Sequence, residues 1–569
     1  MPPRSNKGIV IIVVLAVLVF GITFLIINIT QNVGKTTNQV SEEQSLETMA
    51  RLYKKIRVNN LPPIKDQVEL NPVNIADSLP DISKYPPQVN NNTQDFIEIF
   101  SSTEKATVSG NKSTDTDRWL VDMAEAFNKS GATVDGRPVS VCIRGMASGL
   151  AMDYISSGKY VPDAFSPSNE LWGDALEANG IAIRLAEKRL TGNVAGIVLS
   201  KDKQKKIMDK YGSAGLNAIV QAVTAGDLVM GYTNPLSSST GANFLISTLY
   251  SFDHNDPLSD TAIAAFEGFQ SNIPFVAYTT LQMKESAQSG VLEGFIFEAQ
   301  QFMNSPDLRS DYTFTPFGVR HDNPVYALGS LSAVKEEILN RFIAFCKTDD
   351  SQNKAAKYGF NQYDDYAIEL AGVHGGVLPQ AQKLWKEKKS GNREIVAVFV
   401  ADISGSMDGS RLNQLKQSLL LGANMISPEN SIGLVTFSDD VNIALPIGKF
   451  DLNQRSLFTG AVRDMTALGG TAMFDGIVVA SKMLTDARAV NPNAKYMMFV
   501  LTDGETNTGS SLRDTRTMIE GLKIPIYTIG YEANINALQT VSGINEAASI
   551  NADEEDVIYK IQNLFNAEI

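Results

Sequence analysis

The stretch VFVADISGSMDGS, residues 398–410, constrains the fold of this chain more than any other segment. Residues 396–400 form an unbroken apolar run, which indicates a strand covered on both faces of its sheet. The run leads directly into Asp402, Ser404 and Ser406. Open α/β sheets place their ligand sites at the carboxyl ends of such strands, so this loop is a candidate site.

Two later segments add oxygen-bearing side chains. LGGTAMFDG contains Thr471, and MMFVLTDGET places Asp503 after another apolar strand. Each piece alone has an alternative as a turn or a helix cap, because Asp and Ser are ordinary turn residues. Together they provide carboxylate and hydroxyl oxygens, hard donors that suit a small octahedral cation retaining some of its waters.

This set resembles the von Willebrand factor A (VWA) domain and its metal-ion-dependent adhesion site, over residues 393–569. All five motif positions are matched, by Asp402, Ser404, Ser406, Thr471 and Asp503. The resemblance implies that the hydroxyls bind the cation, that the carboxylates act mostly through water, and that a partner's carboxylate completes the coordination. We expect Mg²⁺, with Mn²⁺ or Ca²⁺ as alternatives.

The pattern of residues 389–569 predicts a doubly wound, mostly parallel, Rossmann-like sheet. The strands are the apolar runs EIVAVFVAD, SIGLVTFS, KYMMFVLTD and IPIYTIGY. Helical patterns lie between them, in RLNQLKQSLLLGANMI, TAMFDGIVVASKML and SSLRDTRTMIEGLK. VNIALPIGKF is expected to be an edge hairpin, since Pro446 is tolerated at an edge.

The amino terminus predicts a membrane anchor at residues 8–29, with residues 1–7 cytoplasmic. Residues 9–27 are uncharged and almost wholly apolar, and a helix of that length spans ~29 Å, close to the thickness of a bilayer. Arg4 and Lys7 precede the run, which favours a single-pass cell-membrane protein whose remaining domains are extracellular. A cleaved signal peptide and a buried soluble helix are the alternatives.

Residues 30–94 are polar and rich in Asn, Gln and Pro, and we expect a stalk, or a strap packed on a domain. The net charge of −14 argues against nucleic acid as a partner. The two cysteines, Cys142 and Cys346, have apolar neighbours, which is typical of buried free thiols. An extracellular location would also permit a disulfide.

Residues 95–388 alternate strands with helices. The strands are DFIEIF, PVSVCIRG, NVAGIVLS, DYTFTPFGVR and NPVYALG, and amphipathic helices such as RWLVDMAEAFNKS lie among them. This order resembles the type 2 periplasmic solute-binding fold, which implies a bilobal α/β domain that closes over a ligand.

On that resemblance, ligand groups lie where strands end and helices begin. The candidates are Ser101, Ser102, Thr103, Ser148, Ser166, Asn234, Ser237, Ser238, Ser239, Thr240 and Gly241. Hydroxyls and amides there suit an anion or a polar small molecule, although each residue has a helix cap as its alternative. Trp172 and Tyr232 are further candidates for the cleft, or core residues.

Two functions from different classes remain open, and neither is enzymatic. The chain contains no Gly-rich phosphate loop with a Lys, no H-E-x-x-H and no G-x-S-x-G, and its three histidines are scattered. The first is a bacterial surface-binding protein whose metal holds an acidic group of a protein partner. The second is a small-molecule sensor or transport-linked receptor, in which the VWA domain relays closure of the cleft.

Overall fold

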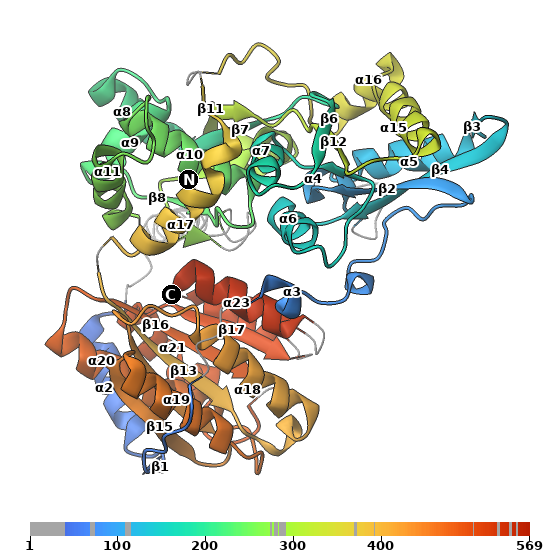
Figure 1. Cartoon of the computed structure of the whole chain (residues 1–569). Coiled ribbons are helices and arrows are strands. Elements are labelled where there is room, and N and C mark those ends of the chain that lie inside the picture. Colours follow the sequence, from blue (N-terminus) through green and yellow to red (C-terminus); the bar gives the residue numbers. More distant parts are fainter. Residues whose placement is uncertain are drawn as a thin grey trace, which may run out of the picture.

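The structure is a computed structural model that describes residues 40–68, 74–108, 115–273, 276–277, 283, 292–368, 372–391, 393–504, 506–531, 535–544, 549–552 and 556–569. Two bodies are stacked on each other: a C-terminal domain and a two-lobed middle domain (Figure 1). The strands form sheets of seven, six and five strands, the first in the C-terminal domain.

The C-terminal domain is a sheet in the order β1-β15-β14-β13-β16-β17-β18, where only the β14–β15 pair is antiparallel. Its strands are β1 (Val58–Asn60), β13 (Ile395–Asp402), β14 (Ser431–Phe437), β15 (Val441–Lys449), β16 (Lys495–Thr502), β17 (Ile526–Tyr531) and β18 (Ser549–Ala552). The predicted mixed α/β, mostly parallel architecture is confirmed for this domain.

Helices cover both faces of this sheet, because its strands carry apolar side chains on both faces. One face packs on α18 (Ser410–Ala423), α19 (Leu452–Asp464) and α23 (Val557–Glu568). The other packs on α2 (Glu42–Tyr53), α20 (Met473–Val490), α21 (Leu512–Leu522) and α22 (Ile535–Ile544). A short 3-10 turn, η3 (Gly405–Met407), follows β13.

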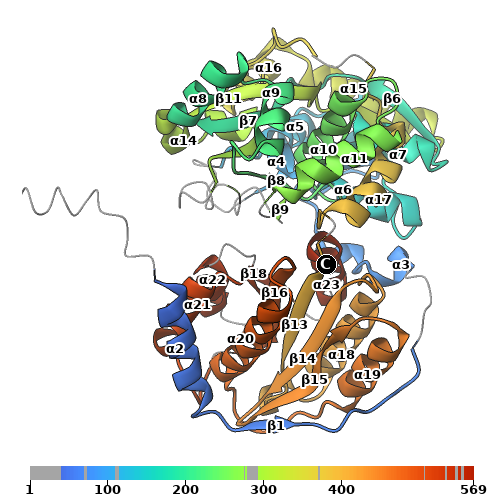
Figure 2. The ribbon, with the colours of Figure 1, turned by 90° about the vertical axis from the view of Figure 1, so that its left-hand side faces the viewer.

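Residues 42–60, which the sequence assigned to a stalk or strap, pack on the C-terminal domain (Figure 2). Ser41 caps α2 in a capping box with Gln44, and Met49 and Leu52 enter the core beneath α20 and α21. β1 pairs with residues 441–443, so that part of β15 is not at the edge of the sheet as expected. Pro446 lies beyond this pairing.

The first lobe of the middle domain is a sheet in the order β3-β4-β2-β5-β12-β6. Its strands are β2 (Asp95–Ser101), β3 (Thr133–Val134), β4 (Arg137–Gly145), β5 (Ala164–Ser166), β6 (Ile183–Glu187) and β12 (Val325–Leu328). Its helices are α3 (Ile75–Ser78), η1 (Ile82–Lys84), α4 (Thr103–Ala106), α5 (Trp119–Lys129), α6 (Ser148–Ser157), α7 (Leu171–Ala178), α15 (Ala333–Cys346) and α16 (Asp349–Lys357). Cys142 and Cys346 are buried free thiols in this lobe, and burial raises the pKa of Cys142 to about 11.

The second lobe is a sheet in the order β11-β7-β10-β8-β9. Its strands are β7 (Val194–Ser200), β8 (Met230–Thr233), β9 (Val276–Ala277), β10 (Gly294–Glu298) and β11 (Tyr312–Arg320). Its helices are α8 (Lys201–Tyr211), α9 (Leu216–Thr224), α10 (Ser239–Phe252), α11 (Asp260–Ser271), α13 (Ala299–Met303) and α14 (Pro306–Asp311), followed by η2 (Gly375–Val377) and α17 (Leu378–Lys388). The chain crosses between the lobes more than once, which is typical of a two-lobed cleft.

Helix α23 joins the two domains. Tyr559 on α23 donates a hydrogen bond of 2.8 Å to Asp153 on α6, and its ring belongs to the apolar cluster of the middle domain. Lys389, just after α17, donates to the backbone oxygen of Asn566 on α23 at 2.6 Å. Within the described part of the chain no helix is long and apolar enough to span a membrane. The predicted anchor at residues 8–29 lies outside the described residues.

Candidate functional sites

The predicted metal residues converge at the carboxyl edge of the C-terminal sheet. Asp402 ends β13, and its Oδ1 accepts a 2.8 Å bond from the backbone N–H of Ser404. The hydroxyl oxygens of Ser404 and Ser406 are 3.1 Å apart, and Ser406 Oγ donates to Asp503 Oδ1 at 2.8 Å. Four of the five side chains therefore surround one point.

Thr471 is brought to the same edge by its loop. The N–H of Gly405 donates to the backbone oxygen of Gly469 at 2.9 Å, and the N–H of Leu468 to that of Ile403 at 2.8 Å. These bonds place the loop that precedes α20 against the loop that follows β13. Thr471 itself is 4% exposed. It lies two residues before the start of α20, which packs on the sheet.

The electrostatics of this loop cluster favour a cation. Asp402 is fully buried, and burial raises its pKa to about 6, with the charge of Asp503 acting in the same direction. Two carboxylates held near each other with hydroxyl groups between them are costly unless a positive charge joins them. The donors are all oxygens, as Mg²⁺ requires, so the residues present fit the expected ion.

The sequence analysis missed several residues of this cluster, among them Thr502, whose hydroxyl donates to Asp402 Oδ2. Arg411, at the start of α18, donates to Asp503 Oδ2 at 2.9 Å. Asn507 accepts from the N–H of Thr471 at 2.8 Å, and Asp439 accepts from the N–H of Gly470 at 3.0 Å. Single polar residues in loops give no periodic signal, so only the assembled structure shows that they support the site.

A second site is a cavity of about 210 Å³ between the two lobes of the middle domain. It is lined by Ser102, Thr103, Glu104, Ala147, Ser148, Ser168, Thr233, Ser237, Ser238, Ser239, Thr240, Glu298 and Gln301. The lining comes from α4, α6 and the loop before α7 on one side, and from β8, β10, α10 and α13 on the other. The two lobes touch beside the cavity, because Ser239 Oγ donates to Ser148 Oγ at 3.1 Å.

Seven of the eleven predicted cleft residues line this cavity: Ser102, Thr103, Ser148, Ser237, Ser238, Ser239 and Thr240. The other four, Ser101, Ser166, Asn234 and Gly241, are not among the lining residues. Asn234 instead closes a turn by accepting from the N–H of Leu236 at 2.9 Å, and the N–H of Gly241 donates to the cap hydroxyl of Ser238 at 3.3 Å. For Asn234 this local structural role explains the residue.

Both aromatic candidates are core residues. Trp172 is 1% exposed and its indole N–H donates to Ser239 Oγ at 2.9 Å, so it supports a lining residue from behind. Tyr232 is equally buried and donates to Gln270 Oε1. Glu104, Glu298 and Gln301 line the cavity and were not predicted, because isolated polar residues at the ends of elements give no pattern.

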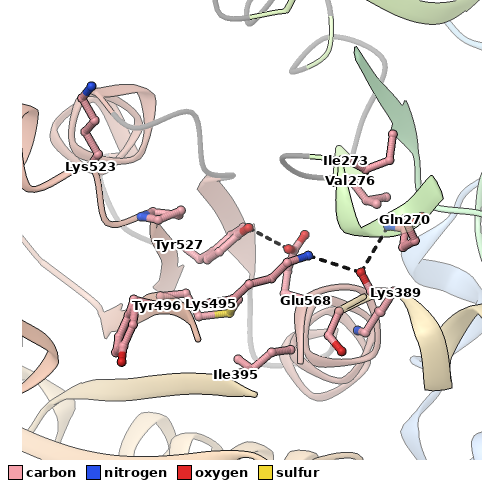
Figure 3. A pocket seen from close by; sticks show the side chains of 13 residues that line it. Gln270, Ile273, Val276, Lys389, Ile395, Lys495, Tyr496, Lys523, Tyr527 and Glu568 are labelled. Carbon is pink, nitrogen blue, oxygen red and sulfur yellow. Dashed lines mark hydrogen bonds between the residues drawn. The ribbon is translucent and has the colours of Figure 1, made fainter. Parts of the chain in front are cut away.

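A third cavity, of about 250 Å³, lies at the junction of the two domains (Figure 3). Tyr527 donates to Glu568 Oε2 at 2.6 Å, and Lys495 Nζ donates to the backbone oxygen of Lys389 at 3.3 Å. Burial raises the pKa of Glu568 to about 7 and lowers the pKa of Lys495 to about 8. The cavity borders the amino ends of β13 and β16, whereas the metal loops follow the carboxyl ends of these strands. The two sites therefore lie at opposite edges of the sheet.

Comparison with known proteins identifies both domain types. Residues 397–566 match the von Willebrand factor type A domain family, and residues 113–361 match the bacterial extracellular solute-binding protein family. The chain therefore combines a VWA domain with a bacterial solute-binding domain, as the two resemblances predicted.

The match to curated relatives covers about a quarter of the chain. Inter-alpha-trypsin inhibitor heavy chain H3 of Mesocricetus auratus is 32% identical over 154 residues, which cover 24% of this chain and 17% of that protein. The Homo sapiens heavy chain H3 is 31% identical over 150 residues, covering 24% and 16%. The chain thus spans about a sixth of the length of these relatives.

Solved structures are similar to parts of the chain. A von Willebrand factor type A protein from Catenulispora acidiphila is 18% identical with a TM-score of 0.29, covering 31% of this chain and 42% of that one. The sulfate-binding protein SubI from Mycobacterium tuberculosis is 15% identical with a TM-score of 0.33, covering 48% and 88%.

Proposed function

We propose that the protein is a membrane-anchored, extracellular binding protein that uses a Mg²⁺-dependent adhesion site to hold an acidic group of a protein partner. The convergence of Asp402, Ser404, Ser406 and Asp503 on one point, with the Thr471 loop tied against them, is the observation that carries this proposal. Binding, not catalysis, is the proposed activity.

In this proposal the hydroxyls of Ser404, Ser406 and Thr471 hold the ion, and Asp402 and Asp503 act mostly through its waters. The ion supplies a position for a carboxylate oxygen of the partner. Two carboxylates balance most of its charge, so the partner's carboxylate joins a nearly neutral centre. The affinity from the metal alone is therefore modest, and other contacts at the rim must add to it.

The location of the site supports recognition of a partner from outside. β13 begins at the domain junction, where Ile395 lines the third cavity, and ends at Asp402. Eight residues of strand extend ~26 Å, so the metal loops face away from the middle domain. The apolar residues 9–27 would hold the protein in the membrane, with the domains extracellular.

Calorimetry of the full chain with Mg²⁺ and Mn²⁺ tests the metal site. Asp402→Ala should abolish the binding isotherm while the far-UV spectrum stays unchanged, because the residue ends a strand whose remaining residues still pack. Asp408→Ala is the matched control, since Asp408 is an exposed carboxylate of the same loop. Absence of Mg²⁺ and Mn²⁺ binding at millimolar concentration would remove the basis of the proposal.

A second function, a small-molecule sensor or transport-linked receptor, is favoured by the cavity between the lobes. Its lining is contributed by both lobes, so a bound molecule would favour their closed arrangement. The contact of α23 with α6 gives the VWA domain a direct link to the first lobe. Mass spectrometry of small molecules released from the purified protein distinguishes this function from adhesion alone.

A further inference from the structure

Two hydroxyls that line the cavity between the lobes donate their protons to carboxylates. Ser102 Oγ donates to Glu104 Oε1 at 2.6 Å and accepts from Lys105 Nζ. Thr240 Oγ1, from the other lobe, donates to Glu298 Oε1 at 2.7 Å. A hydroxyl has one proton and two lone pairs. These two hydroxyls can therefore offer only lone pairs to a molecule in the cavity.

Glu298 faces a neutral histidine. His321 Nδ1 is 2.7 Å from Glu298 Oε1, and its Nε2 is 3.0 Å from the amide nitrogens of both Asn169 and Asn243. The Asn243 amide is oriented by the N–H of Val319, which donates to its Oδ1 at 3.0 Å. Nε2 therefore accepts bonds and carries no proton, so the ring does not neutralise the charge of Glu298.

Lys105 balances only one of the two carboxylates that line the cavity. It is fully buried, pairs with Glu104 at 3.5 Å and donates to the backbone oxygen of Ser166 at 3.0 Å. Nearby, burial raises the pKa of Asp117 to about 6, and the charge of Glu104 acts in the same direction. The charge of Lys105 also acts on Glu298, but one cation cannot balance two carboxylates, so the cavity is negative overall.

The lining holds a further acceptor without an internal partner. Gln301 Oε1 is buried and has no hydrogen-bond partner in the described part of the chain. No lysine, arginine or aromatic residue is found among the described lining residues. The amino ends of α6 and α10 reach the cavity, but two of their amides are engaged: Gly149 N–H donates to Ser237 O and Gly241 N–H to Ser238 Oγ, both at 3.3 Å.

From this arrangement we propose that the cleft binds a small organic cation bearing an ammonium or guanidinium group, and not an oxyanion. An ammonium group offers three donors and a guanidinium five, which match a cavity of oxygen acceptors with one uncompensated carboxylate. An ionised oxyanion brings only acceptors and a like charge. The volume of about 210 Å³ equals that of roughly seven waters at ~30 Å³ each, so the ligand is small.

This inference rests on the receptor function proposed above, and one titration series tests the two separately. The full chain is titrated by calorimetry with ethanolamine, a linear diamine and arginine, and in parallel with sulfate, phosphate and acetate. We expect at least one of the cations to bind at millimolar concentration or below, and none of the anions.

Two variants assign the binding to this cavity. Glu298→Gln removes the uncompensated charge and should weaken binding of the cation about tenfold or more. Gln301→Leu removes an acceptor that makes no internal hydrogen bond, so the fold should hold while affinity falls about threefold or more. Glu177→Gln, at an exposed position on α7, is the control and should bind as the wild type does.

Each other outcome overturns a defined part of the inference. Binding of an oxyanion but of none of the amines refutes the ligand class and leaves the receptor function standing. Binding of neither class refutes the inference, and the absence of any small molecule released from the purified protein would then refute the receptor function as well. Amine binding that is unchanged in both Glu298→Gln and Gln301→Leu refutes the assignment to this cavity.

Discussion

The burial of Asp153, at the contact with Tyr559, should make the stability of the middle domain depend on pH. Burial raises the pKa of Asp153 from 3.8 to about 7, and the Tyr559 hydroxyl is its hydrogen-bond donor at 2.8 Å. In the unfolded chain the carboxyl ionises near 3.8, whereas in the folded protein it stays protonated to about pH 7. The stability it provides is therefore fully present below the lower value and is lost as pH rises to the higher one.

The magnitude follows from the shift. Each pKa unit corresponds to ~1.36 kcal/mol, so the full loss is ~4 kcal/mol, of which ~3 kcal/mol falls between pH 5 and pH 8. The side chain is partly exposed to solvent, so we expect half of that, ~1.5 kcal/mol, as a lower bound. Asp153→Asn cannot ionise and keeps an oxygen for the Tyr559 hydroxyl, so it should escape this loss.

Urea unfolding followed by tryptophan fluorescence measures the effect. All three tryptophans, Trp119, Trp172 and Trp385, lie in the middle domain and are buried, so the signal reports on that domain. The stability of Asp153→Asn relative to the wild type should rise by ~1.5–3 kcal/mol from pH 5 to pH 8. The exposed Asp209→Asn is the control. A difference that is constant or falls with pH refutes the reasoning.

Three further predictions concern other parts of the molecule. Arg411→Gln should raise Mg²⁺ affinity about threefold to tenfold in calorimetry, because its guanidinium competes for Asp503; weaker affinity would show that it supports the ion instead. Gly149→Ala places a Cβ 2.2 Å from the backbone oxygen of Leu236 and should lower stability by ~1–3 kcal/mol in thermal unfolding; an unchanged melting temperature contradicts this close contact. The chain should stay in the membrane fraction of cells, with its carboxyl end open to added protease; a soluble form starting near Asn28 would indicate a cleaved signal instead.

The central strands and the metal loops were predictable because their signals are local. A strand such as β13 is apolar throughout, and Asp402, Ser404 and Ser406 follow it directly in the sequence. The same holds for Asp503 after β16. Parallel strands bring their carboxyl ends to one edge, so the sequence and the topology together were enough to place these side chains.

The supporting residues could not be predicted because their contacts are distant in sequence. β1 has the sequence VNN, with no alternation to mark a strand, and it exists as a strand only because it pairs with β15. Glu298 is 58 residues from Thr240, its donor in the cleft. Arg411 reaches Asp503 across 92 residues, and no spacing in the sequence indicates such a pair.

The docking of α2 has a consequence for the synthesis of this protein. Ser45 bonds to the backbone oxygen of Thr517, which is 472 residues later in the chain. At a translation rate of ~5–20 residues per second, the ribosome needs roughly 24–94 s to produce that partner. For most of this interval Met49 and Leu52 have no helix of the VWA domain to cover them, because α20 and α21 are made near its end. The whole solute-binding domain emerges first and can fold in that time. The VWA domain is therefore completed last, although its helix α2 is made before the solute-binding domain.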